Sequence, residues 1–316
     1  MDLVFCGTPQ FAVPTLQALV EAGHKLRLVV TQPDRPSGRG MELAAPPVKQ
    51  LAQKLGLAIA QPDKIKNNAE FRAQLEKIAP RAIIVVGYGR IVPGWMLELP
   101  PLGNLNLHAS LLPKYRGAAP IQWAIAKGEI VTGNTTMRID AGLDTGDILL
   151  QQEEPIAPND TALTLAPRLA AKGAVLMVET LRGLDAGTIT PCPQDNSLAT
   201  LAPILKKEDG QIDFSQTAQQ IYNRLRGFLP WPSAFTTFRG KKLNILEAKS
   251  VVGPVLSPGE LRVEGERMFV GCGSNSSLEL IVLLPEGKKR MSAREFLNGY
   301  RPNPKETLVS SWAERE

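Results

Sequence analysis

The start of the chain alternates strand, helix and strand, and this order constrains the fold more than any other feature. Residues 3–6 (Leu-Val-Phe-Cys) form an apolar run typical of a buried strand, and residues 26–31 form a second one. Between them, a helical pattern directs Leu16 and Leu19 toward a core and ends at Gly23. A helix that connects two neighbouring strands makes them parallel. We therefore predict an α/β fold whose N-terminal domain is a Rossmann-like parallel sheet.

A dinucleotide-binding enzyme is the first alternative for such a start. However, the turn after the first strand, residues 7–9 (Gly-Thr-Pro), lacks the Gly-x-Gly-x-x-Gly pattern that lets a pyrophosphate approach the backbone. The sequence therefore disfavours NAD or FAD binding and an oxidoreductase.

A second turn at the same predicted edge of the sheet could receive a flat ligand. The β-branched run at residues 82–86 predicts a central strand, and Gly87, Tyr88, Gly89 and Arg90 follow it. Ligands bind at the carboxyl edge of parallel sheets, and glycines let them approach the backbone there. An ordinary strand-to-helix turn is the simpler interpretation.

Asn106 and His108 are the strongest candidates for chemistry. They alternate with Leu105 and Leu107 in the period of a strand, so the two polar side chains share one face. A loop with proline and glycine follows, which places the pair near the carboxyl end of that strand. His108 is one of two histidines in the chain, and an imidazole at this edge suits proton transfer near neutral pH. A histidine satisfied by local hydrogen bonds is the alternative.

Residues 142–147 (Gly-Leu-Asp-Thr-Gly-Asp) strengthen the chemical interpretation. Two glycines bracket Asp144, so a tight turn could bring its carboxylate close to the imidazole or to a substrate. An amide, an imidazole and a carboxylate without a nearby nucleophilic Ser or Cys favour carbonyl polarisation with proton transfer over a covalent acyl-enzyme. Asp140, Asp144 and Asp147 have no supporting His, Glu or calcium-loop spacing, so we predict no metal site.

These motifs resemble a known family, the formyltransferases that use 10-formyltetrahydrofolate. The residues that carry the resemblance are Asn106, His108, the run 110–117 (Ser-Leu-Leu-Pro-Lys-Tyr-Arg-Gly) and the run 140–147 (Asp-Ala-Gly-Leu-Asp-Thr-Gly-Asp). The similarity extends from residues 7–14 to residues 291–299, nearly the whole chain. The resemblance implies that 10-formyltetrahydrofolate is the co-substrate, without a metal, and that the acceptor is the α-amine of methionine esterified to initiator tRNA.

The resemblance also implies which residues are catalytic. Asn106 would donate a hydrogen bond to the oxyanion of the tetrahedral intermediate, and His108 would stabilise or protonate that oxygen. Asp144 would raise the basicity of the imidazole and accept the proton of the amine.

The implied co-substrate site is larger. It comprises Tyr88, Gly89, Arg90, Ser110, Leu111, Leu112, Pro113 and Asp140. For Leu111 and Leu112, plain core packing is an equal alternative. The sequence leaves open whether Tyr115 and Arg116 face the tRNA or the folate.

Residues 32–47 form a loop rich in Pro and Gly that carries Arg35 and Arg39. Its composition alone favours a solvated surface loop. In family members that act on tRNA, a similar loop contacts the acceptor end, so the resemblance makes Arg35 and Arg39 tRNA-binding residues, with Arg39 against phosphates or an unpaired base. Members that formylate small molecules are expected to lack this loop.

The second half of the chain predicts a different architecture. We expect a catalytic domain at residues 1–186, a linker at 187–204, where periodicity is lost, and a second domain at 205–316. Several short strands with turn signals there predict a small β-barrel, which the resemblance makes OB-like and tRNA-binding. Lys206 and Lys207 are its first predicted tRNA contacts. The formal charge of +5 is compatible with an anionic partner.

The composition also predicts the location and redox state of the protein. The sequence has no apolar run of membrane-spanning length and begins without a signal-like segment, so we predict a cytoplasmic protein with no membrane partner. We also predict a monomer, although the sequence itself does not determine the oligomeric state. Three separated cysteines favour reduced thiols over disulfides. The alternatives are a formyltransferase or formyl-folate hydrolase acting on a small molecule, or a tRNA-binding protein without activity.

Overall fold

The computed structural model describes residues 1–37, 42–303 and 306–309 and divides the chain into two compact units. The first unit comprises residues 1–120, 131–155 and 166–203. The second comprises residues 121–130, 156–165 and 204–316.

A mixed sheet of seven strands organises the described part of the first unit, in the order β5-β2-β1-β6-β7-β8-β9. Its strands are β1 (Asp2–Gly7), β2 (Lys25–Val30), β5 (Ile59–Ala60), β6 (Ala82–Val86), β7 (Asn104–His108), β8 (Val131–Arg138) and β9 (Ile148–Pro155). The strands from β5 to β7 are parallel, as predicted. The predicted parallel arrangement does not extend to β8, which is antiparallel to both β7 and β9. Residues 139–147 join β8 to β9 without a crossover helix, as antiparallel neighbours allow.

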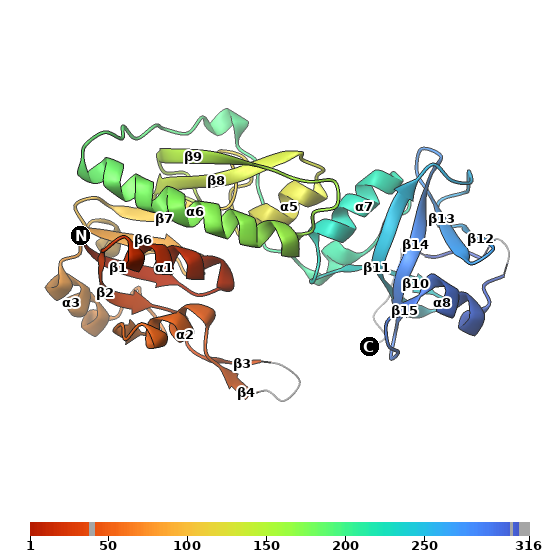
Figure 1. Ribbon diagram of the computed structural model, residues 1–316, viewed down its shortest axis with the longest axis horizontal. Coiled ribbons are helices and arrows are strands. Elements are labelled where there is room, and N and C mark those ends of the chain that lie inside the picture. Colours follow the sequence, from red (N-terminus) through yellow and green to blue (C-terminus); the bar gives the residue numbers. More distant parts are fainter. Residues whose placement is uncertain (38–41, 304–305, 310–316) are drawn as a thin grey trace. The chain divides into compact units, whose positions relative to one another are not determined.

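Helices cover both faces of this sheet. They are η1 (Gln10–Ala12), α1 (Val13–Glu21), α2 (Pro47–Lys54), α3 (Ala69–Ile78), α4 (Gly94–Leu97) and most of α6 (Ala162–Asp185). One core, which includes Leu16 and Leu181, joins the sheet to α1, α2 and α6. In Figure 1, α6 crosses in front of the strands. The other core joins the opposite face to α3 and α4 through Phe71 and Met96. The helical pattern predicted between the first two strands corresponds to η1 and α1, which ends two residues before Gly23.

The strand order reverses between β1 and β6, which makes the carboxyl ends of these strands the expected ligand edge. Leu105 and Leu107 belong to the core under α1 and α6. Because side chains alternate along a strand, Asn106 and His108 point to the other face. The antiparallel β8 pairs Thr135 with His108 and then runs toward the amino end of β7.

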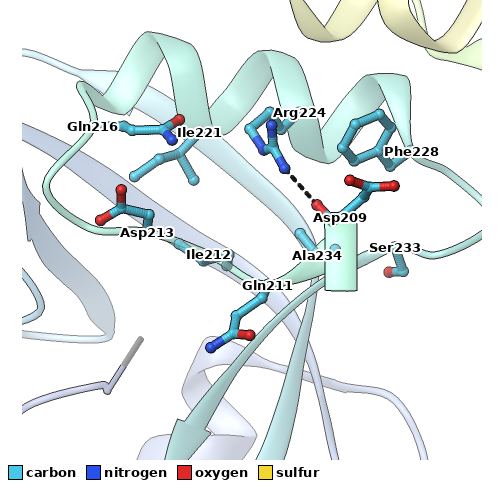
Figure 2. A pocket seen from close by; sticks show the side chains of 11 residues that line it. Asp209, Gln211, Ile212, Asp213, Gln216, Ile221, Arg224, Phe228, Ser233 and Ala234 are labelled. Atoms are coloured by element: carbon cyan, nitrogen blue, oxygen red, sulfur yellow. Dashed lines mark hydrogen bonds between the residues drawn. The ribbon is translucent and has the colours of Figure 1, made fainter. Parts of the chain in front are cut away.

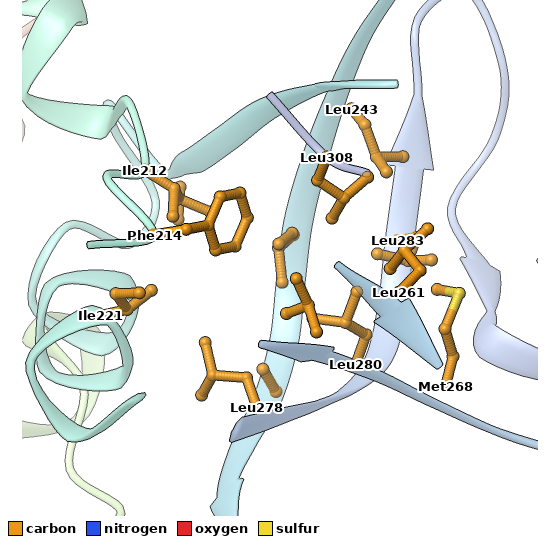
Figure 3. Close-up of a cluster of buried hydrophobic side chains, with 14 of the residues drawn as sticks. Ile212, Phe214, Ile221, Leu243, Leu261, Met268, Leu278, Leu280, Leu283 and Leu308 are labelled. Carbon is orange, nitrogen blue, oxygen red and sulfur yellow. The ribbon is translucent and has the colours of Figure 1, made fainter. Parts of the chain in front are cut away.

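The second unit contains an antiparallel sheet in the order β10-β11-β14-β13-β12, with β15 paired to β14. Its elements are β10 (Ala234–Phe238), β11 (Lys241–Val251), β12 (Leu261–Glu264), β13 (Arg267–Cys272), β14 (Ser276–Pro285), β15 (Met291–Ser292), α5 (Pro120–Ala126, all but Pro120), η3 (Lys207–Gly210), α7 (Ala218–Gly227) and α8 (Ala293–Tyr300). The apolar side chains of the sheet face Ile221 of α7 and Phe214 around one core (Figure 3).

Two short strands, β3 (Arg35–Ser37) and β4 (Glu42–Ala44), form an antiparallel pair within the predicted tRNA-binding loop. Arg39 lies outside the described residues. Within the described ranges, no helix combines the length and the apolar character needed to span a bilayer. The remaining element, η2 (Asn196–Leu198), belongs to the predicted linker.

Candidate active site

The ring of His108 is fixed by the backbone of Tyr115. His108 is the last residue of β7 and is 6% exposed. Its Nε2 atom lies 2.9 Å from the carbonyl oxygen of Tyr115. A carbonyl oxygen only accepts hydrogen bonds, so Nε2 carries a proton and donates it. The lone pair of the neutral ring is therefore at Nδ1, which is the atom that can take up a further proton.

Asp144 lies on the Nδ1 side of this ring. Its Oδ2 atom is 3.7 Å from Nδ1 of His108 and accepts a hydrogen bond of 2.8 Å from the backbone N–H of Gly117. A proton that reaches Nδ1 thus creates an imidazolium beside a carboxylate, which stabilises it. The predicted proximity of Asp144 to the imidazole is confirmed.

Asn106 shares the face of His108 on β7 and is half-buried. Its partner in the register of the neighbouring strand is Val85 of β6, so the amide lies beside the central strands of the sheet. Within the described part of the chain, the amide side chain makes no hydrogen bond, which leaves its N–H groups available to a ligand.

Asp140 shapes the turn that carries Asp144. Its carboxylate accepts hydrogen bonds from the backbone of Gly142, at 3.0 Å, and from the hydroxyl of Thr145, at 2.7 Å. A Cβ atom at position 142 would lie 2.0 Å from that hydroxyl, so only glycine fits. Asp144 itself adopts a positive φ of 52°. Asp140 therefore sets the conformation of residues 140–147; its predicted contact with the co-substrate stays a prediction.

The loop after His108 is held by Thr135 on the next strand. The hydroxyl of Thr135 donates to the carbonyl of Ser110 at 2.7 Å and accepts from the N–H of Leu112 at 3.1 Å. Ser110 and Leu112 are buried, and the side chain of Leu111 packs against Gly133. Pro113 is half-buried and follows a cis peptide bond. The side chains of Ser110 and Leu112 thus face the protein, so a contact with co-substrate would involve the surface of the loop.

The turn after β6 is held by its backbone. The carbonyl of Tyr88 accepts hydrogen bonds from the hydroxyl of Thr8 at 3.3 Å and from Nε2 of Gln32 at 3.1 Å, and Gln32 also donates to Gly89. The guanidinium of Arg90 donates to the carbonyl of Asp63. These bonds fix the turn at the carboxyl edge, beside the end of β1.

The side chain of Tyr88 is directed into the core. It is 2% exposed, and its hydroxyl has no partner among the described residues. Burial raises the pKa of Tyr88 above its usual range, with a smaller contribution from Cys6. The phenol is therefore neutral, and Tyr88 offers a ligand its backbone rather than its ring.

Residues 194–202, which fall in the predicted linker, make contacts with the loop after His108 that were not predicted. In the structure, Thr200 Oγ1 accepts from the N–H of Tyr115 at 2.9 Å, and Arg116 exchanges backbone hydrogen bonds with Thr200 and Ala202. Gln194 and Arg116 form part of the same contact. This contact settles the surroundings of Arg116, which is buried and faces this segment. No local pattern marks these residues, because each bond joins positions about 80 residues apart.

The predicted tRNA-binding residues lie in different parts of the chain. Arg35 is exposed on β3 and donates to Gln32 at 3.2 Å. Lys206 is exposed and precedes the short helix η3, which Lys207 begins. Burial, and next the charge of Lys207, lowers the pKa of Lys242, while the charge of Glu286 opposes this shift, so Lys207 and Lys242 lie near each other.

A small hollow in the second unit contains Arg224, shown with its neighbours in Figure 2. The guanidinium donates to the carbonyl of Asp209 at 2.6 Å. Burial lowers the pKa of Arg224, while the charges of Asp209 and Asp213 oppose this shift. The carboxylates of Asp209 and Asp213 thus lie close enough to offset part of the positive charge of this guanidinium. Among the described residues, no group of His, Cys, Asp and Glu is arranged to hold a metal ion.

Family models cover both halves of the chain. The model described as "Formyl transferase" matches residues 1–181, and the model described as "Formyl transferase, C-terminal domain" matches residues 204–301. The methionyl-tRNA formyltransferase of Koribacter versatilis is 68% identical over 98% of this chain and 98% of its own. That of Acidobacterium capsulatum is 62% identical over 98% and 99%, respectively.

Solved structures share the fold at lower identity. An N-formyltransferase from Helicobacter canadensis, in complex with folinic acid and dTDP-3-aminofucose, has a TM-score of 0.66 and 20% identity over 88% of this chain and 98% of that chain. HypX from Aquifex aeolicus, in complex with tetrahydrofolic acid, has a TM-score of 0.62 and 17% identity over 100% of this chain and 50% of that chain.

Proposed function

Because the chain belongs to the formyl transferase family, with methionyl-tRNA formyltransferases 62% and 68% identical over its length, we propose that it transfers a formyl group from 10-formyltetrahydrofolate to methionyl initiator tRNA. The relatives support formyl transfer to methionyl-tRNA. We also propose that 10-formyltetrahydrofolate is the donor and that initiator tRNA is preferred over elongator tRNA. The observation that carries the mechanism is the His108 ring, held between the Tyr115 carbonyl and the Asp144 carboxylate.

The reaction needs an oxyanion to be stabilised and a proton to be removed. The α-amine of methionine attacks the formyl carbon, and the carbonyl oxygen becomes negatively charged in the tetrahedral intermediate. Asn106, whose amide is available, donates to this oxygen. The ring of His108 lies on the same face of β7 as Asn106, so the imidazolium that forms when Nδ1 takes up the amine proton stabilises the same charge.

The proton of the attacking amine passes to Asp144 or to Nδ1 of His108. Nε2 is already protonated and engaged with Tyr115, so Nδ1 is the ring atom that gains and loses the proton. The carboxylate of Asp144, at 3.7 Å, stabilises the charged ring. When the intermediate collapses, the C–N bond to the folate breaks and the leaving nitrogen takes up this proton.

The donor would lie along the loops that surround this pair. We propose contacts with the turn of Tyr88, Gly89 and Arg90 and with Asp140, and with the loop of Ser110, Leu111, Leu112 and Pro113. Two of the structural neighbours were solved with folate derivatives, which supports a folate site on this fold.

We propose that the second unit is an OB-like barrel. Its two edge strands are β10 and β12, and residues 306–309 pair near both of them. Val309 pairs with Thr237 of β10, and Thr307 pairs with Glu260, which precedes β12. Leu308, between the two, belongs to the core. A segment that bonds to both edges supports closure of the sheet, because closure leaves no free strand edge.

The tRNA would contact cations of both units. We assign Arg35, Arg39, Lys206 and Lys207 to this role, in which each neutralised phosphate adds affinity that salt weakens. The proximity of the two cations Lys207 and Lys242 supports it. We also keep the predictions that the enzyme acts as a monomer and in the cytoplasm, where charged tRNA is used.

The test is formyl transfer by the purified protein from 10-formyltetrahydrofolate. Methionyl initiator tRNA and methionyl elongator tRNA are offered in parallel, with a control that lacks an acceptor. We expect formylation of the initiator with little of the elongator. Equal use of both would refute the initiator preference, and folate turnover without an acceptor would favour the hydrolase alternative.

A further inference from the structure

Asp140 fixes the shape of the turn that carries Asp144, but its hydrogen bonds join the turn only to itself. Residues 140–147 are stabilised internally by Asp140, but Asp144 and Gly142 are exposed or half-buried on it. The antiparallel register starts this turn at the amino end of β7, beside Leu105. The turn must therefore fold back over the sheet to bring Asp144 to His108, and contacts from outside it must fix that arrangement.

Gln194 supplies such contacts. Its Nε2 atom donates to the carbonyl oxygens of Asp144 and Gly146, each at 2.8 Å. Its Oε1 atom accepts from the guanidinium of Arg116 at 3.1 and 2.7 Å. Because a guanidinium only donates and a carbonyl only accepts, the orientation of the amide is unambiguous. Both amide hydrogens are directed at the turn.

Arg116 is itself anchored. It is 6% exposed, donates to Oδ1 of Asn196 at 2.8 Å and pairs through its backbone with residues 200–202. The next residue, Gly117, donates its N–H to Oδ2 of Asp144. Residues 116 and 117 thus hold Asp144 twice, directly through its carboxylate and, by way of Gln194, through its backbone.

We propose that Gln194 is a positioning residue for the transfer step. Oriented by Arg116, it clamps the backbone on both sides of Thr145 and so sets the Asp144 carboxylate opposite Nδ1 of His108. This inference rests on the proposed function, in which Asp144 and His108 handle the proton. Gln194 does not touch the reacting atoms; its effect passes through Asp144.

Two substitutions separate the two halves of the clamp. Gln194→Leu removes the contacts with both the turn and Arg116. Gln194→Glu keeps an acceptor for Arg116 but replaces the donor with an oxygen that repels the carbonyls of Asp144 and Gly146. Ser197→Ala is the matched control in the same segment, because Ser197 bonds only to Asp195 among the described residues.

The experiment measures steady-state formyl transfer to methionyl initiator tRNA. A displacement of the catalytic group by about 1 Å costs about 10²-fold, so we expect kcat to fall by roughly 10- to 100-fold in Gln194→Leu and Gln194→Glu. KM for the donor and for the tRNA should stay within about 2-fold, since the clamp is not assigned to binding. Ser197→Ala should match the unaltered protein. Thermal unfolding confirms that each variant is folded.

The same substitutions are then made in the Asp144→Asn background. If Gln194 acts through Asp144, its loss should there lower kcat by less than about 2-fold further, because residues that act as one unit are not additive. An undiminished loss in that background would overturn the proposal, as would full activity of Gln194→Glu or a loss confined to KM. If Asp144→Asn and His108→Ala alone left kcat unchanged, the proposed mechanism would fail instead.

Discussion

The Oδ2 atom of Asp144 faces Nδ1 of His108 at 3.7 Å while the opposite nitrogen of the ring donates to a backbone carbonyl. This distance is longer than a hydrogen bond, so no hydrogen bond joins the ring and the carboxylate. It is short enough for a strong electrostatic attraction between a protonated ring and the carboxylate. This arrangement suits a proton that must move during a reaction cycle.

The charge of Asp144 should matter more than its shape. Asp144→Asn keeps an oxygen that can accept from Gly117 but removes the negative charge opposite His108. We expect kcat to fall by about 10² to 10⁴, the usual loss when one partner in proton transfer is removed. Rapid-quench measurement of a single turnover checks the transfer step itself. Asp147→Asn, which changes a neighbouring carboxylate, is the control and should retain activity; comparable losses in both would point to the overall charge of the turn.

Gly117 should tolerate no side chain. It adopts φ of 124°, and a Cβ atom there would lie 2.6 Å from the carbonyl oxygen of Ala202. Gly117→Ala should therefore cost about 1–3 kcal/mol of stability for the backbone conformation, with more for the contact. It should also lower kcat, because the N–H of Gly117 holds Asp144.

Gly94→Ala is the comparison for that variant. A Cβ atom at Gly94 meets no atom within 4 Å, so stability should change little. Chemical denaturation measures both variants. A Gly117→Ala protein as stable and active as Gly94→Ala would contradict the steric argument.

Thr135 should be required for the loop that follows His108. Thr135→Val keeps the shape of the side chain but leaves the N–H of Leu112 and one N–H of Gln151 without this acceptor. A buried group deprived of its partner costs about 1–3 kcal/mol. We expect this loss of stability with a fall in activity, measured by denaturation and by formyl transfer.

Thr132→Val on the same strand is the matched control. Thr132 is also buried, but its hydroxyl has no partner within the described residues. Removing it should be neutral or stabilising. Equal destabilisation by the two substitutions would mean that hydroxyl burial, not the loop contact, decides the effect.

Local patterns of the sequence predicted the elements well. The strand at 82–86 lies where its apolar, β-branched run places it, because a strand buried on both faces needs apolar side chains at every position. The direction of β8 was not predictable in this way. Strand direction depends on pairing between distant segments, and an apolar run reads the same in either direction.

The site was predictable only where its chemistry leaves a local pattern. The glycines around Asp144 indicated a tight turn, and the alternation at Asn106 and His108 indicated a shared face. Gln194 lies in a segment without periodicity, and its partners are about 50 and 80 residues away. A glutamine side chain also has no titratable or nucleophilic group that would single it out in the sequence. Such supporting contacts become visible only when the fold is known.

The buried thiols should report on the two units separately. Cys6 lies in the first unit and Cys272 in the second, and both are buried, while Cys192 is exposed. Burial raises the pKa of Cys272 to about 12 and that of Cys6 further. Because the thiolate is the reactive form, only Cys192 should react quickly with a thiol reagent in the native protein at pH 8.

The raised pKa values of the buried thiols also determine whether the stability of the fold rises or falls with pH. In the unfolded chain a thiol ionises near a pKa of about 8.5, whereas in the folded chain it stays protonated to higher pH. The protonated thiols therefore contribute their full stability below the unfolded pKa of about 8.5. This stability is lost as pH rises through the folded pKa, about 12 for Cys272. Cys272→Ser tests this by denaturation at pH 7 and pH 10, against Cys192→Ser as control. Loss of stability between these values should be smaller in Cys272→Ser than in the unaltered protein; an identical loss would show that other groups dominate.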